Sequence, residues 1–217
     1  MKKVQQLIIG IVLFIPFLYL SAWVSLVGYL FEGVLLNWLF IVIAAGISLP
    51  SLLSIDRHIK HPSKQQLNQP LKARYFYIAV IWAIFSVVLT LTLNNLAFLP
   101  APTDNVLQSS TAKILAGPLR WPMIISLCFL TPICEELGFR GVMQNYLSNI
   151  FGYWPSILIT SLIFVFLHGY EIVASLCLFI STIGFSLFNR ASGTMKTSIV
   201  SHMTYNIIVT ILIVLQL

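Results

Sequence analysis

Apolar residues in this 217-residue chain come in long uninterrupted blocks, and this feature restricts the fold more than any other. A helix that crosses a bilayer needs about 20 consecutive apolar residues, and several blocks approach that length. Only 8% of the residues are charged and 59% are hydrophobic, so the chain lacks the charge needed for a water-exposed surface. The sequence therefore predicts an all-α fold, a polytopic transmembrane helical bundle, and excludes a soluble globular domain.

Seven spans is the central prediction for this bundle, within a range of six to eight. They are expected at residues 7–31, 34–55, 75–99, 121–146, 154–168, 172–188 and 198–217. The fifth and sixth are the shortest, so either is a candidate for a re-entrant segment. Pro16 predicts a kink in the first span. The polar stretches at 56–74 and 100–120 are expected to form loops.

Lysine and arginine are distributed unequally along the chain, which has a net charge of +6. With a cytoplasmic N-terminus, nine of the 12 fall on the cytoplasmic side: Lys2, Lys3, Arg57, Lys60, Lys64, Lys72, Arg74, Arg190 and Lys196. Lys113 and Arg120 fall outside, and Arg140 lies within a span. Because cytoplasmic loops are enriched in these residues, the N-terminus is expected inside and the C-terminus outside. No basic stripe alternates with aromatic residues, so no nucleic-acid partner is expected.

The three cysteines lie in apolar segments and show no metal-binding or disulfide spacing. Cys128, Cys134 and Cys177 are an odd number, and no Cys-x-x-Cys pair is present. We expect all three to be buried packing residues.

The fourth predicted span carries three ionisable residues, although such groups cost about 2.5–3.5 kcal/mol each inside a membrane. Glu136 and Arg140 are four residues apart, so they share a helix face in the order that favours an ion pair. Glu135 projects about 100° around the helix axis from Glu136 and is expected to stay available. A buried glutamate without a cation is suited to proton exchange near neutral pH.

Two other spans carry further polar side chains. His202 and Asn206 share one helix face and can donate hydrogen bonds to an anionic oxygen. His168 follows Phe164 by one helical turn. Each feature alone has a structural explanation: an ion pair that fixes helix register, a satisfied core histidine, or interhelical hydrogen bonding. Their occurrence together on three spans favours a functional site.

Three short motifs at these positions resemble the CAAX protease and bacteriocin-processing (CPBP) family of intramembrane endopeptidases. The first is Glu-Glu-x-x-x-Arg at 135–140, the second is Phe-x-x-x-His at 164–168, and the third is His-x-x-x-Asn at 202–206. The likeness covers about residues 121–210. It implies a type II CAAX prenyl endopeptidase-like, glutamate-dependent peptidase of a bacterial cell membrane.

The resemblance also implies roles for individual residues. Glu135 would act as the general base on a water molecule, assisted by His168. His202 and Asn206 would form the oxyanion hole. Residues 121–217 would then be the catalytic helical core, preceded at 1–120 by N-terminal transmembrane helices and a basic cytoplasmic loop.

The resemblance further implies that Glu136 and Arg140 orient the fourth helix. No cofactor is expected. Zinc is the less favoured alternative, with Glu135, His168 and His202 as its ligands, because the His-Glu-x-x-His signature is missing. The expected partners are the lipid bilayer and a membrane-associated peptide or protein substrate.

Two other functions fit the same polar residues. One is a proton-coupled transporter, because intramembrane carboxylates and histidines also form relays. The other is a non-proteolytic bacteriocin self-immunity or scaffold protein of the same fold. The predicted topology also poses a geometric problem, because His168 ends its span while His202 lies near the start of its own. The fifth helix must therefore tilt, start deep or end within the membrane.

Overall fold

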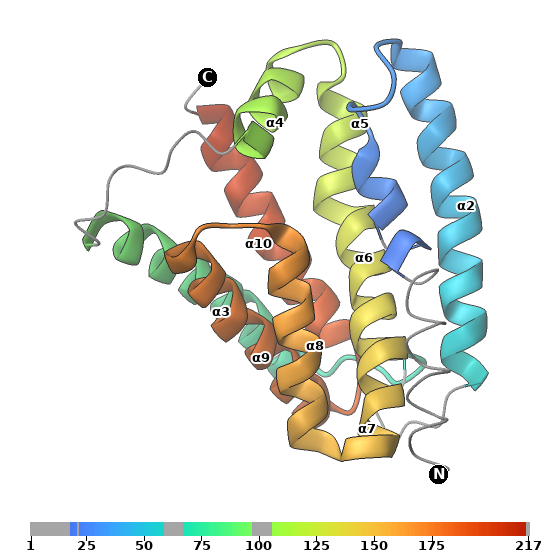
Figure 1. Ribbon diagram of the computed structural model, residues 1–217, viewed down its shortest axis with the longest axis vertical. Coiled ribbons are helices and arrows are strands. Elements are labelled where there is room, and N and C mark those ends of the chain that lie inside the picture. The colour runs from blue at the N-terminus through green and yellow to red at the C-terminus, as the bar shows by residue number, and fades with distance from the viewer. Residues whose placement is uncertain (1–17, 21, 59–66, 97–105, 216–217) are drawn as a thin grey trace.

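The computed structural model describes residues 18–20, 22–58, 67–96 and 106–215 (Figure 1). Within these ranges the regular secondary structure is entirely helical, which confirms the all-α prediction. The helices are η1 (Trp23–Leu26), α2 (Val34–His58), α3 (Ala73–Leu96), α4 (Val106–Ala116), α5 (Arg120–Ile125), η2 (Ser126–Leu130), α6 (Thr131–Glu136), η3 (Leu137–Gln144), α7 (Asn145–Phe151), α8 (Tyr153–His168), α9 (Ile172–Ser192) and α10 (Lys196–Leu215).

Five helical segments in the described ranges are long and apolar enough to cross a membrane. They are α2, most of α3, the continuous segment from α5 to α7, α9 and α10. The polytopic bundle is therefore confirmed, with α8 as a shorter apolar helix of 16 residues.

The prediction of one continuous helix at 7–31 is wrong for the part of this range that the structure describes. Residues 1–17, with the predicted kink at Pro16, lie outside the described residues. The short 3-10 helix η1 ends at Leu26, and Gly28 then adopts a left-handed backbone conformation with φ of 80°. The buried amide of Asn37 accepts a hydrogen bond from the Gly28 N–H at 2.7 Å and donates to the Phe31 carbonyl, also at 2.7 Å. These bonds stabilise a turn in place of a last helical turn.

The predicted loop at 100–120 contains the helix α4, so that prediction is wrong for residues 106–116. The helix has a simple cause in the sequence. Pro100, Pro102 and Pro118 flank the α4 segment, whereas no proline or glycine interrupts it.

A continuous helical rod from Arg120 to Phe151 lies at the centre of the bundle. It consists of α5, η2, α6, η3 and α7, and it has 32 residues. Two of its stretches, η2 and η3, are π-helical, a form that occurs frequently at functional sites. Figure 1 shows the rod between α2 and α8, and both helices contact it. The rod is therefore the element best placed to hold polar side chains away from lipid.

Helix α8 returns along the rod and ends about halfway up it (Figure 1). Gly152, with φ of 85°, makes the sharp turn that reverses the chain after α7. At the other end, Gly169 adopts the left-handed conformation with φ of 61° and terminates the helix after His168. The short helix resolves the geometric problem posed by the predicted topology, because His168 is carried only to the middle of the bundle.

Helices α3, α9 and α10 pack against one another, and α9 also contacts α8 while α10 contacts the rod. Gly184 of α9 lies flat against the indole of Trp82, so close that a Cβ atom would sit 2.3 Å from the ring. The Trp82 Nε1–H also donates to the Ser181 carbonyl at 3.2 Å. This contact joins α3 to the carboxy-terminal helices.

One end of the bundle gathers basic residues, and we call it the basic end. Here α2 and α9 end and α3, α8 and α10 begin. The Tyr75 hydroxyl donates to the Ala191 carbonyl, and the Arg190 guanidinium lies 3.9 Å from the Tyr153 ring centroid. Its described basic residues are Arg57, Lys72, Arg74, Arg190 and Lys196. At the opposite end, where α2 and α5 begin, lie Lys113 and Arg120.

The three cysteines are free and buried, as predicted. Cys134 packs in a core cluster with Leu52, Leu137 and Met195, and this cluster joins α2 to the rod.

Candidate functional site

A fully buried ion pair occupies the middle of the rod. Arg140 Nη1 lies 3.1 Å from Glu136 Oε1, and both side chains are 0% exposed. The pair predicted from the four-residue spacing is therefore present. The Arg140 guanidinium also lies over the rings of Phe164 at 4.8 Å and Phe185 at 5.6 Å. Cation–π contacts with α8 and α9 compensate part of the cost of burying the charge.

His202 of α10 lies between the two adjacent glutamates. Its Nδ1 is 3.1 Å from Glu136 Oε1, and its Nε2 is 3.8 Å from Glu135 Oε2. Because the Glu136 carboxylate can only accept, the Nδ1 atom carries the hydrogen in this contact. The ring is further fixed by stacking on Phe185, with centroids 5.6 Å apart. The sequence did not predict that His202 would bond to the glutamate of the ion pair.

The Glu135 carboxylate is not part of the Glu136–Arg140 ion pair. Its side chain is 13% exposed, against 0% for Glu136. This difference agrees with the prediction that one glutamate of the adjacent pair is neutralised and the other remains available.

His168 is held at the end of α8 by the carbonyl of the preceding turn. Its Nδ1 lies 2.8 Å from the Phe164 oxygen and must donate, because a carbonyl only accepts. In the neutral ring, Nε2 is then an acceptor. The fully buried Phe164 ring contacts His168 at 4.3 Å and His202 at 6.0 Å between centroids. Phe164 thus contacts both His168 of the second motif and His202 of the third.

The two histidines and Asn206 line a common cavity of about 40 Å³. The other lining residues are Tyr170, Leu178, Ser181, Phe185 and Tyr205. A cavity of this volume is large enough for about one or two water molecules when polar groups surround it. No hydrogen bond or ion pair joins His168 to Glu135, so the structure brings His168 to the cavity of His202 and Asn206 but does not bond it to the glutamate.

Asn206 is anchored to the rod by a hydrogen bond that the sequence did not predict. Its Nδ2 donates to the Leu127 carbonyl at 2.8 Å. Leu127 lies in the π-helical stretch η2, where the ordinary i to i+4 ladder is interrupted. One amide hydrogen of Asn206 is therefore occupied, and the second remains for the cavity.

Further polar residues in the rod support the site and were missed by the sequence reasoning. The Asn145 amide donates to the carbonyls of Arg140 at 3.0 Å and Gly141 at 2.8 Å, which lie in the second π-helical stretch. Gln144 accepts a hydrogen bond from the Ser186 hydroxyl at 2.7 Å. In the sequence, the feature that could have identified Asn145 and Gln144 is an uncharged amide side chain within an apolar span.

The suggested zinc ligands do not form a metal site in this geometry. Among the described residues, no group of three or more His, Cys, Asp or Glu side chains is arranged to hold a metal ion. His202 Nδ1 donates to Glu136, and this leaves Nε2 as the ring atom directed toward Glu135. The metal-free reaction stays a prediction.

The fold and the polar cluster define an integral membrane protein with a buried glutamate, histidine and asparagine site. Residues 117–208 match the Rce1-like family model, described as type II CAAX prenyl endopeptidase Rce1-like. The match spans all three motifs, and it confirms the resemblance predicted from them. No curated protein and no solved structure matches the chain significantly.

Proposed function

We propose that this protein is an intramembrane endopeptidase in which Glu135 activates water for attack on a peptide bond. The observation that carries the proposal is the position of His202 between Glu135 and the buried Glu136–Arg140 pair. The Rce1-like match over the same residues supports the same class of reaction. A membrane-associated peptide or protein is the proposed substrate.

In this mechanism Glu135 takes a proton from water, and the water oxygen bonds to the carbonyl carbon of the substrate. The electron pair of the carbonyl moves to its oxygen, which becomes an oxyanion. The carbon–nitrogen bond then breaks, and Glu135 returns the proton to the leaving amine. His168 assists by accepting a hydrogen bond at Nε2 from the water in the cavity that it lines.

The oxyanion would be stabilised by His202 and Asn206. When His202 is protonated, Nδ1 donates to Glu136 and Nε2 donates into the site. The 3.8 Å between Nε2 and Glu135 Oε2 is longer than a direct hydrogen bond and leaves room for an oxygen atom that contacts both. The second amide hydrogen of Asn206 is the other donor. Protonated His202 and Arg140 would balance the charges of Glu135 and Glu136.

Glu136 and Arg140 act in this proposal as positioning residues. Glu136 orients the His202 ring through Nδ1, and Arg140 neutralises Glu136 within the protein. The side chains that surround Arg140, including Phe164 and Phe185, exclude water from this pair. A desolvated pair of this kind holds His202 in one orientation.

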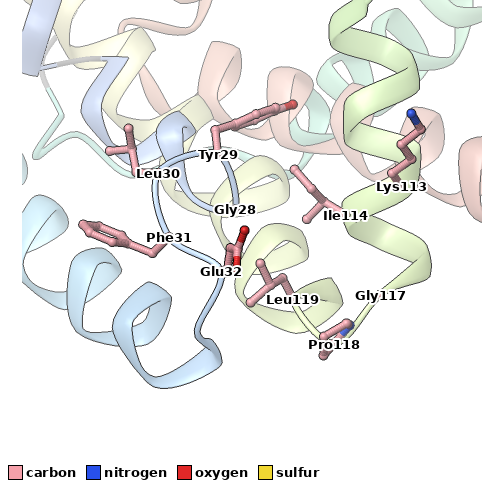
Figure 2. Close-up of a pocket in the computed structure, with 10 residues that line it drawn as sticks. All are labelled: Gly28, Tyr29, Leu30, Phe31, Glu32, Lys113, Ile114, Gly117, Pro118 and Leu119. Atoms are coloured by element: carbon pink, nitrogen blue, oxygen red, sulfur yellow. The ribbon is translucent and has the colours of Figure 1, made fainter.

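The proposal is tested by comparing peptides in membranes of cells that contain wild-type protein or Glu135→Gln. This substitution keeps the shape of the side chain and removes the base, so we expect cleavage products to disappear with Glu135→Gln. Lys72→Gln is the control, because Lys72 is exposed at the basic end of the bundle and lines neither the cavity of the site nor the cavity at the opposite end (Figure 2). Identical peptides with wild-type protein and Glu135→Gln would refute the proposal, and Glu135-dependent flux in proteoliposomes would favour the transporter.

A further inference from the structure

Two arginines at the basic end are held in place by tyrosine side chains. The Arg74 guanidinium, in the first turn of α3, lies 4.6 Å from the centroid of the Tyr75 ring, and its Nη2 donates to the Tyr75 hydroxyl at 3.2 Å. The Arg190 guanidinium, in the last turn of α9, lies over the Tyr153 ring of α8. The Tyr75 hydroxyl in turn donates to the carbonyl of Ala191, the residue after Arg190. Both arginines are exposed, and both belong to the contact where α3 begins and α9 ends.

Neither arginine has a carboxylate partner in the part of the chain that the structure describes. The whole sequence has only six acidic residues: Glu32, Asp56, Asp104, Glu135, Glu136 and Glu171. The ion pairs among the described residues all belong to the candidate site, and none includes Arg74 or Arg190. Asp56, at the basic end of α2, is buried next to Gly141 of the rod. The two guanidinium groups thus keep N–H donors from which an external anion can accept hydrogen bonds.

Two helices that begin at the basic end carry cations where helix electrostatics favour anions. The N-terminus of a helix has a partial positive charge. Lys72 precedes α3, Arg74 lies in its first turn, and Lys196 is the first residue of α10. Neither helix has an acidic residue in its first turn. A bound anion would compensate this unfavourable arrangement.

The opposite end of the bundle has a different arrangement of charge. A cavity of about 430 Å³ lies there, lined by residues 28–32 and by parts of 113–119. Both Glu32 and Lys113 line it, and Figure 2 shows the Glu32 carboxylate near Leu119. A carboxylate and an ammonium group of the protein therefore share this cavity. In contrast, the charges that α3 and α9 bring to the basic end are both positive, so the basic end is the better candidate for an anion site.

The two arginines lie next to exposed apolar side chains. These are Phe76 and Tyr77 on α3, Trp154 on α8 and Leu187 on α9. Each is within one helical turn of Arg74, Arg190 or Tyr153 along its own helix. Trp and Tyr are enriched where membrane-spanning helices meet the lipid headgroups. The guanidinium groups therefore lie at headgroup depth, beside a surface that faces lipid.

We propose that Arg74 and Arg190 together bind the phosphate of an anionic phospholipid, whose acyl chains lie along the exposed apolar side chains of α3 and α9. Arginine matches phosphate oxygens with pairs of N–H donors, and the tyrosine contacts reduce the freedom that binding must restrict. The apolar surface beside the arginines favours a lipid over a soluble phosphate. By the distribution of Lys and Arg this end is cytoplasmic, so the lipid belongs to the inner leaflet. Neither arginine lines the cavity of the candidate site, so the binding does not depend on the proposed function.

The proposal is tested with purified protein in a neutral detergent and dioleoylphosphatidylglycerol that carries a fluorescent label on an acyl chain. About 0.5 M salt in the buffer screens the general attraction between exposed charges. We expect saturable binding that Arg74→Gln and Arg190→Gln each weaken at least about tenfold, since each removes hydrogen bonds to a charged group. Arg57→Gln is the matched control, because Arg57 is exposed at the same end but on α2, which packs against the rod. It should weaken binding less than about twofold.

Competition separates the headgroup from the acyl chains and from free phosphate. Unlabelled dioleoylphosphatidylglycerol should displace the probe. Dioleoylphosphatidylcholine has the same acyl chains but no net charge, and it should require at least about fivefold more lipid. Glycerol 3-phosphate has the anionic group without the chains, and it should require at least about a hundredfold more, because each buried CH₂ group adds to lipid binding.

Each contrary result overturns the proposal. Equal weakening by Arg57→Gln and Arg190→Gln would assign the binding to the basic end as a whole. Equal competition by phosphatidylcholine would show that the acyl chains alone bind, and competition by glycerol 3-phosphate at the concentration of the lipid would assign the site to soluble phosphates. If Arg190→Gln does not accumulate, Arg190→Lys replaces it and should still weaken binding more than Arg57→Gln, because lysine lacks the paired donors. No cleavage is measured, so failure of this proposal is separate from failure of the proposed function.

Discussion

Helix α2 and the central rod are both long apolar helices, yet their environments differ. In their most apolar windows, 61% of the rod residues are buried inside the protein, compared with 22% for α2. The rod carries Glu135, Glu136 and Arg140 near its middle. The middle of α2 is apolar and faces lipid with side chains such as Val42 and Ile43.

This difference shows how a membrane protein accommodates charge. A charged group in lipid has no compensating partner. The rod is surrounded by α2, α8 and α10, so its ion pair receives His202 and aromatic rings as neighbours. Burial within protein, and not hydropathy alone, separates the helix that holds the site from the helix that supports it.

The largest expected effect on stability comes from breaking the buried pair. Arg140→Met leaves the Glu136 carboxylate without its cation, and removing one partner of a buried pair costs about 3–5 kcal/mol. We expect a large loss of thermal stability in detergent and a low yield in membranes. The double variant Glu136→Gln with Arg140→Met should recover part of the loss, and Lys113→Met should have little effect. An unchanged unfolding temperature for Arg140→Met would contradict this description of the rod.

A smaller effect is expected at the contact between α3 and α9. Gly184→Ala places a Cβ atom 2.3 Å from the Trp82 ring, so the two helices must separate. Overpacking of this kind costs about 1–3 kcal/mol. The loss should appear as a lower midpoint of thermal unfolding, and adding Trp82→Ala should reduce the effect of the Gly184 substitution. If the Gly184 effect is the same in both backgrounds, the contact is not its cause.

The smallest stability effects should differ in sign between the rod and α2. Gly141→Ala brings a Cβ atom to 2.9 Å from Asp56 Oδ1 and 3.3 Å from Met195 Sδ, so it is expected to destabilise. Gly46→Ala in α2 meets nothing within 4 Å, so it should stabilise by up to about 1 kcal/mol through helix propensity. Parallel unfolding curves measure both changes. Equal effects of the two substitutions would remove the distinction between the helices.

The sequence predicts much of the fold because long apolar blocks and ion-pair spacing are local signals. The spans corresponding to α2, α3, the rod, α9 and α10 follow from hydropathy, and the Glu136–Arg140 pair follows from helical periodicity. Helix α8 ends at Gly169, which limits how deep His168 lies in the bundle. This depth does not follow from the local sequence, because it depends on how the helices pack.

Other features depend on contacts between segments that are distant in the chain. The Asn37 bonds to Gly28 and Phe31 replace a helical turn with a tight turn. The bond from Asn206 to Leu127 requires the π-helical distortion in η2, for which the sequence offers no periodic signal. His202 similarly reaches Glu136 across 66 positions of the chain, so its orientation does not follow from the spacing of its own motif.

The central claim is tested most directly by the turnover of purified, reconstituted protein with a quenched fluorescent peptide whose sequence is taken from a membrane peptide that the wild-type protein cleaves. Glu135→Gln and wild-type protein are compared at equal amounts, with thermal unfolding measured in parallel. We predict at least about a hundredfold loss of turnover, as expected for removal of a general base, with an unchanged unfolding temperature. Turnover of Glu135→Gln at the wild-type rate would contradict the claim that this carboxylate activates the attacking water.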